Sequence, residues 1–194
     1  MRITPDDVTW LLRAGHGVFS VAEARLRGIT RSRLVRLERS GLLVRLARGV
    51  YAAAADHAAA DPWTAFGLRS RAFTLACGPR AFAAGWSAAA VHGLPAIRPP
   101  PAQPLAYLMD GAGSAVNSRY GSVRVAALPP DQCVYVDGCR VTSLPRTVVD
   151  LARWGPRADA LVVADAALAS GVTSGDLQAM LDLQAGWRGS RDAA

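Results

Sequence analysis

Arginines gather on one predicted helix near the N-terminus, and this residue type at this place suits the recognition of phosphates and base edges. Residues 31–40 place two leucines on one face and Arg33 and Arg36 on another. Arg31 and Arg33 lie in the first turn, where a positive charge opposes the helix dipole at a cost of about 0.3–1 kcal/mol each. A helix that needs only stability has acids there. The pattern therefore favours a helix whose N-terminus meets DNA; a solvated basic face without a partner is the alternative.

The positive charge of the chain is concentrated in the same region. The first fifty residues contain ten arginines and four acids, whereas the whole chain of 194 residues has a net charge of only +7. A local basic field of this kind is typical of a nucleic-acid-binding module joined to another part.

The elements around the basic helix predict a winged helix-turn-helix. A first helix begins with Thr4 as its cap and Pro5 at its first position, and a second begins at a capping box of Ser20 and Glu23. Thr30 caps the basic third helix. Residues 42–51 then alternate around a turn that contains Gly49, with Arg48 at its tip, which predicts a two-stranded wing.

The rest of the chain predicts a mixed α+β part, so we expect two domains, at residues 1–55 and 62–194. Residues 52–61 are either a linker or the start of a helix. Helices are expected at 63–76, 87–92, 144–154, 157–169 and 173–184, and strands at 105–109, 122–128, 133–136 and 140–143. The fold class is therefore α+β, with an N-terminal winged helix-turn-helix and a mixed α/β C-terminal domain.

Candidate catalytic residues lie in the second part, but they form no recognisable constellation. Arg146 and Asp150 stand four residues apart on one helix, where we expect an ion pair, and Asp165 follows on the next. His92 before a glycine is expected to cap or pack, although it could also titrate. Ser87 lacks the glycines of a nucleophile elbow. We expect no catalytic residues and no enzyme activity.

Composition also argues against other classes of protein. Three histidines and three cysteines have no zinc-ligand spacing, so neither a metal nor a cofactor is expected. Cys133 and Cys139 are either reduced strand residues or face each other across a hairpin. No secretory signal or apolar run long enough for a membrane helix is evident. We therefore expect a cytoplasmic protein with no membrane partner.

Several segments in this order resemble the AbiEi family of antitoxins in the form common in actinobacteria. They are LLVRLARGVYA in the wing, SAAAVHGL at 87–94, VTSLPRTVVDLAR at 141–153, DAAL at 165–168 and VTSGDL at 172–177. In related proteins that share these motifs, the same two regions precede a C-terminal nuclease domain that resembles very-short-patch-repair endonucleases. We expect no such domain, and no carboxylate cluster of its kind, within these 194 residues.

The resemblance implies an antitoxin of a type IV toxin–antitoxin system. Its winged domain would bind inverted repeats of double-stranded DNA in its own promoter and repress the operon. Its C-terminal domain would counteract a nucleotidyltransferase-like toxin encoded beside it. The DNA-binding positions carried onto this sequence are Arg31, Ser32, Arg33, Arg36, Arg45 and Arg48.

Two other functions stay open at this point. The chain could be the N-terminal portion or a non-catalytic relative of a very-short-patch-repair-like endonuclease, or an interaction module whose basic face is incidental. Two copies on an inverted repeat would place their recognition helices about 34 Å apart or a multiple of that. Independent binding of a monomer to each repeat is an equally open alternative.

Overall fold

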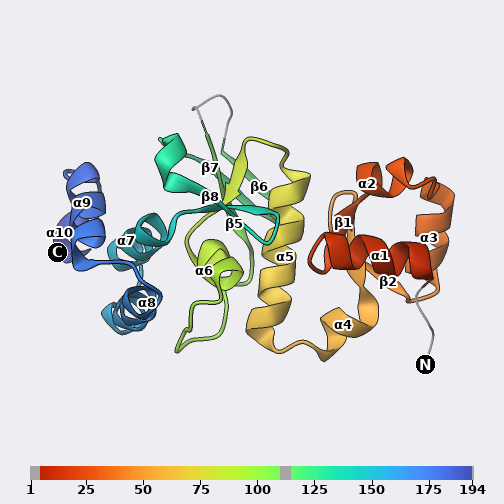
Figure 1. Cartoon of the computed structure of the whole chain (residues 1–194), viewed down its shortest axis with the longest axis horizontal. Coiled ribbons are helices and arrows are strands. Elements are labelled where there is room, and N and C mark those ends of the chain that lie inside the picture. Colours follow the sequence, from red (N-terminus) through yellow and green to blue (C-terminus); the bar gives the residue numbers. More distant parts are fainter. Residues whose placement is uncertain (1–4, 110–114, 194) are drawn as a thin grey trace.

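A computed structural model of the chain describes residues 5–109 and 115–193. The elements follow one another along a single long axis (Figure 1). The N-terminal helices and a small sheet lie at one end, a larger sheet lies in the middle, and the last helices form the other end.

The N-terminal part has the predicted winged arrangement of three helices and a hairpin. Its three-stranded antiparallel sheet has the order β1-β3-β2. The elements are α1 (Asp6–Ala14), β1 (Val18–Ser20), α2 (Val21–Leu26), α3 (Arg31–Arg39), β2 (Leu43–Ala47) and β3 (Val50–Ala53). β1 is absent from the sequence prediction because three residues between a glycine turn and a helix cap are too few to show alternation.

α1 begins one residue later than the sequence predicts. Pro5 has a ψ of 145°, which lies outside the helical range, so it precedes the helix instead of occupying its first position. Its carbonyl accepts hydrogen bonds from the N–H groups of Val8 and Thr9 at 3.0 and 2.9 Å. The predicted cap Thr4 lies outside the described residues.

The predicted caps of the next two helices are confirmed. Ser20 Oγ accepts from the Glu23 N–H at 3.2 Å, and the Glu23 carboxylate accepts from the Ser20 N–H at 2.7 Å. Thr30 Oγ1 accepts from the N–H of Arg33 at 3.3 Å. These short-range bonds set the starts of α2 and α3 independently of the rest of the fold.

α5 (Pro62–Ala76) joins the two sheets, because opposite sides of it pack on different cores. Ala72 and Leu68 pack against the winged sheet, and Phe73 packs against the larger one. Apolar residues all round a helix are expected where both sides are buried. The low-complexity segment before it forms a short helix, α4 (Ala54–Ala59), which resolves the alternative in favour of helix.

The larger sheet is mixed, with the order β6-β7-β5-β4-β9-β8. Two pairs of neighbouring strands are parallel, β4 with β9 and β5 with β7. The other three pairs are antiparallel. Its strands are β4 (Ala81–Ala83), β5 (Leu105–Leu108), β6 (Val116–Ser118), β7 (Gly121–Val125), β8 (Cys133–Val136) and β9 (Cys139–Thr142). The α+β fold class is thus confirmed.

Two details of the second part differ from the sequence prediction. β4 and β6 were not expected, since each has only three residues and β4 is buried throughout without alternation. The strand predicted over 122–128 ends at Val125, before a 3₁₀ turn, η1 (Pro130–Gln132). The structure also decides between the two alternatives for the cysteines. Cys133 and Cys139 do not face each other, because the register of the β8–β9 hairpin pairs Cys133 with Thr142, and neither residue is in a disulfide.

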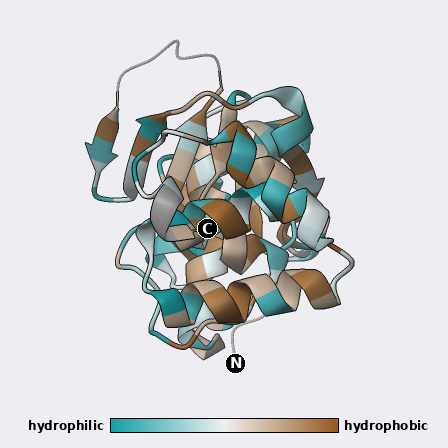
Figure 2. Cartoon of the chain, turned by 90° about the vertical axis from the view of Figure 1, so that its left-hand side faces the viewer, coloured by the Kyte–Doolittle hydropathy of each residue, from teal (hydrophilic) through white to brown (hydrophobic). Residues whose placement is uncertain are grey.

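Helices complete the chain around and beyond this sheet. α6 (Trp86–His92) ends at Gly93, which adopts the left-handed conformation with φ of 72°. α7 (Leu144–Trp154), α8 (Arg157–Ala169), α9 (Ser174–Leu183) and α10 (Ser190–Ala193) follow β9. Figure 2 faces this end and shows hydrophobic segments alternating with hydrophilic ones along its helices.

The close contact of α5 with the larger sheet predicts that Gly121→Ala destabilises the fold. A Cβ at Gly121 would lie 2.8 Å from the ring of Phe73 and 2.8 Å from the carbonyl oxygen of Pro104. Overpacking of this kind costs about 1–3 kcal/mol of unfolding free energy. Urea unfolding measures it, with Gly175→Ala as the control, because the nearest atom to that Cβ is 3.6 Å away. Equal stability of the two variants would contradict the predicted close packing.

Candidate nucleic-acid interface

α3 presents its arginines to solvent because its other face anchors it in the N-terminal core. Leu34 is fully buried, together with Ile29 in the preceding turn, and Leu37 packs against the same core. Arg31, Ser32, Arg36 and Arg39 are exposed. No acid lies in the first turn of α3, whereas α1 has two. The N-terminus of α3 is therefore an open, positively charged surface.

Arg33 differs from its neighbours because it is bound to α1. Its guanidinium contacts both carboxylate oxygens of Asp7, at 2.8 and 3.2 Å. The Arg33 side chain is 40% exposed, so it still reaches the surface in a fixed direction. Asp7 lies in the first turn of α1, 26 positions from Arg33, so no local sequence pattern predicts this contact.

The two wing arginines also differ from each other. Arg45 lies 2.6 Å from the Glu38 carboxylate and its guanidinium lies 5.5 Å from the ring centre of Tyr51. The hydrogen bond to Glu38 raises the pKa of Arg45. Arg48 is exposed in the turn beside Gly49, whose φ is +69°, and has no ion pair among the residues that the structure describes.

A further arginine of this surface was missed from sequence. Arg27, at the end of α2, lies with its guanidinium 3.4 Å from the ring centre of Trp10 on α1. Both side chains are exposed. No sequence pattern predicts this contact, because Trp10 and Arg27 lie on different helices. The described basic surface therefore combines open cations on α3 and the wing with cations held by a neighbour.

The candidate catalytic residues form a buried structural network. Arg146 is 1% exposed, and its Nε donates to Asp150 at 3.0 Å, which confirms the predicted ion pair. Arg153 donates to the other oxygen of Asp150 at 3.4 Å and to the carbonyl of Arg188 at 2.7 Å. Asp165 is exposed on α8 and does not join them. The network ties α7 to the C-terminal segment and leaves no open carboxylate.

His92 and Ser87 also have structural partners. His92 Nε2 lies 2.8 Å from the carbonyl oxygen of Thr142, and burial lowers the pKa of its ring. Ser87 is buried, and its Oγ accepts a hydrogen bond from the Leu105 N–H at 2.8 Å. These contacts join α6 to β9 and β5, as a packing role requires.

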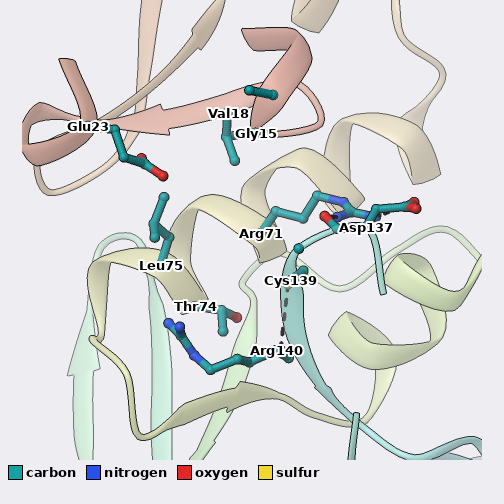
Figure 3. A pocket seen from close by; sticks show the side chains of 11 residues that line it. Gly15, Val18, Glu23, Arg71, Thr74, Leu75, Asp137, Cys139 and Arg140 are labelled. Atoms are coloured by element: carbon teal, nitrogen blue, oxygen red, sulfur yellow. Dashed lines mark hydrogen bonds and ion pairs between the residues drawn. The ribbon is translucent and has the colours of Figure 1, made fainter. Parts of the chain in front are cut away.

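A small pocket of about 190 Å³ lies where the N-terminal part meets α5 and the β8–β9 hairpin (Figure 3). Its two arginines are occupied by backbone oxygens. Arg71 donates to Val136 and Asp137, and Arg140 donates to Ala81 and Gly78. These hydrogen bonds hold the β8–β9 hairpin against α5 and β4. Because both guanidinium groups are already used, we assign the pocket no ligand.

The part of the chain that the structure describes offers neither a cluster of metal ligands nor a membrane-spanning helix. Within residues 5–109 and 115–193, no three His, Cys, Asp or Glu side chains lie together as metal ligands would. In the same ranges, no helix has the length and apolar character needed to cross a membrane.

Comparison with known proteins finds a family similarity for the N-terminal part and a fold similarity for the whole chain. Residues 7–54 match the family model described as "Transcriptional regulator, AbiEi antitoxin". The crystal structure of the RV2827C protein from Mycobacterium tuberculosis is similar in fold, with a TM-score of 0.51 and 21% identity, over 100% of this chain and 76% of that chain. No curated protein matches the sequence. The family match covers α1 to β3, the elements that present the arginines.

If the Arg146 network is structural, Arg146→Ala should lower the free energy of unfolding by about 3–5 kcal/mol, because it leaves Asp150 buried with a weaker counter-charge. Arg33→Ala breaks a partly exposed pair and should cost less than about 1 kcal/mol. Chemical denaturation of both variants checks the contrast. A small loss for Arg146→Ala would mean that the buried pair does not hold this end together.

Proposed function

We propose that the protein is a sequence-specific DNA-binding repressor of its own operon. The match of residues 7–54 to the family model of AbiEi antitoxin transcriptional regulators supports this proposal. α3 is the recognition helix of this proposal and the β2–β3 hairpin is its wing. The observation that supports it most directly is the open cationic surface at the N-terminus of α3.

The exposed residues of α3 suit the reading of DNA in the major groove. Arg31 and Ser32 lie in the first turn and Arg36 follows one turn later. Guanidinium groups can donate two parallel hydrogen bonds to guanine or to phosphate, and the N–H groups of a helix N-terminus attract phosphate. We assign base reading to this turn of α3.

The paired arginines and the wing have a different role in the proposal. Arg33 and Arg45 each keep a carboxylate neighbour, Asp7 and Glu38, which orients the guanidinium before DNA arrives. Pre-oriented donors lose less side-chain entropy on binding. Arg48 lies at the wing tip, where a phosphate or the minor groove is the expected contact.

The second half of the proposal is that the C-terminal part counteracts a nucleotidyltransferase-like toxin. A groove of about 500 Å³ runs between α7, α8 and α9. Leu161 of α8 lines this groove and is 64% exposed (Figure 2 faces this end). An exposed leucine in a groove that half-buried leucines also line supports a protein-binding surface at this end of the chain.

For the DNA-binding half, Arg36→Ala should weaken binding to the DNA upstream of its own gene by about 1–3 kcal/mol, because a lost base contact has this cost. Arg48→Ala, which removes a phosphate contact, should instead lower the salt dependence by about one unit. Fluorescence anisotropy across a salt series, with scrambled DNA for comparison, measures both.

Arg157→Ala is the matched control, because this exposed arginine begins α8 at the other end of the molecule (Figure 1). It should bind operator DNA like the parent protein. Unchanged affinity of both Arg31→Ala and Arg36→Ala would remove α3 as the recognition helix. Equal weak binding to both DNAs would refute sequence-specific repression.

For the antitoxin half, Leu161→Asp should abolish the protection of cells that express the neighbouring nucleotidyltransferase, because it places a charge in the apolar groove. Leu183→Asp is the control, since Leu183 is 63% exposed on α9 but does not line the groove. Growth of co-expressing cells is the readout, with operator binding as the test of folding. Full protection by Leu161→Asp would refute this assignment of the groove.

A further inference from the structure

A second pocket lies between the wing and one edge of the larger sheet, and the proposed function does not use it. Its volume is about 450 Å³, within the range of sites that hold small organic molecules. It is formed by the wing, the C-terminal end of α5, and the strands β6 and β7 with the turn that joins them. The lining residues that carry the argument are Arg45, Arg48, Phe73, Ala76, Arg119 and Tyr120.

The buried part of this lining is apolar. Phe73 and Val123 are 5% and 7% exposed, and Cys77 is half-buried beside them. Burial raises the pKa of the Cys77 thiol to about 11, so this side chain is neutral at physiological pH and behaves as a small apolar group. An apolar, partly aromatic body would be favoured against this wall.

The exposed part of the lining is cationic. Arg45 and Arg48 come from the wing and Arg119 from the β6–β7 turn, and the described residues that line the pocket include no carboxylate. Glu38 shares the charge of Arg45, but Arg48 has no ion pair among the described residues. Arg119 contacts the hydroxyl of Tyr120 and lies 4.6 Å from the centre of its ring. The electrostatic field at the mouth of the pocket is therefore positive.

We propose that this pocket binds a small anion with a flat apolar body, such as an aromatic carboxylate, and that its binding weakens the hold of the wing on DNA. Guanidinium groups bind carboxylates through paired hydrogen bonds, and the rings of Phe73 and Tyr120 supply apolar contact. The arginines of the pocket in Figure 3 are occupied by backbone oxygens, whereas Arg48 is open here.

Arg48 couples the binding of the anion to the binding of DNA. It is both a lining residue and the wing-tip cation, so a ligand that engages it competes with phosphate. By reciprocity, DNA and the anion each weaken the binding of the other to the same extent. This coupling rests on the proposed function; binding of the anion to the free protein does not.

Isothermal titration of the full chain with 2-naphthoate and with its uncharged analogue 2-naphthamide tests the site without DNA. Naphthoate should bind about tenfold more tightly, the effect of one charge-assisted contact. Arg119→Ala should remove most of this preference. Ala76→Trp should abolish binding by filling the pocket, whereas Ala169→Trp, an exposed position on α8, should not.

Equal affinity for the two compounds, or binding that survives Ala76→Trp, would overturn the proposed site, as would no binding of naphthoate at millimolar concentration. Saturating naphthoate should then weaken binding to operator DNA in the parent protein but not in Ala76→Trp. Naphthoate binding without an effect on a functional operator complex would overturn the coupling alone. Absence of operator binding in every sample would instead count against the proposed function.

Discussion

Burial of α5 on two sides is the constraint on which the rest of this structure depends. One side of the helix closes the core of the winged sheet and the other closes the core of the larger sheet. Neither sheet could expose that apolar surface to water without losing about 25 cal/mol for each Å². A single helix therefore sets the position of the wing relative to the β6–β7 edge, and the pocket that contains Arg48 and Arg119 exists only because of this shared packing.

Local charge balance separates the arginines of this protein into two kinds. Arg146 and Arg153 share the buried Asp150, where removing one partner is costly, so they maintain the position of the C-terminal helices. Arg31, Arg36 and Arg48 are exposed without an ion pair among the described residues, so stability does not require them. Cations that do not stabilise the fold are available to an anionic partner.

Much of the secondary structure follows from short stretches of sequence. The box of Ser20 and Glu23, the cap Thr30 and the glycine after α6 act within four residues, and each is confirmed. The bounds of α7 and α8 match their predicted periodicity. The predicted ion pair of Arg146 with Asp150 is also local, since helix geometry places residues four apart side by side. The division into two domains and the assignment of DNA contacts remain predictions.

The sequence by itself determined the basic third helix, the wing and the α+β class, because charge, capping and periodicity are properties of neighbouring residues. Only the tertiary structure decided which arginines are open. Asp7 binds Arg33 across 26 positions, and Arg71 reaches Asp137 across 66. It also decided that β4 is a strand, because this segment pairs with β5 and β9, which lie far from it in the sequence. These outcomes depend on pairing between distant segments, whose energies come from contacts that no local pattern records.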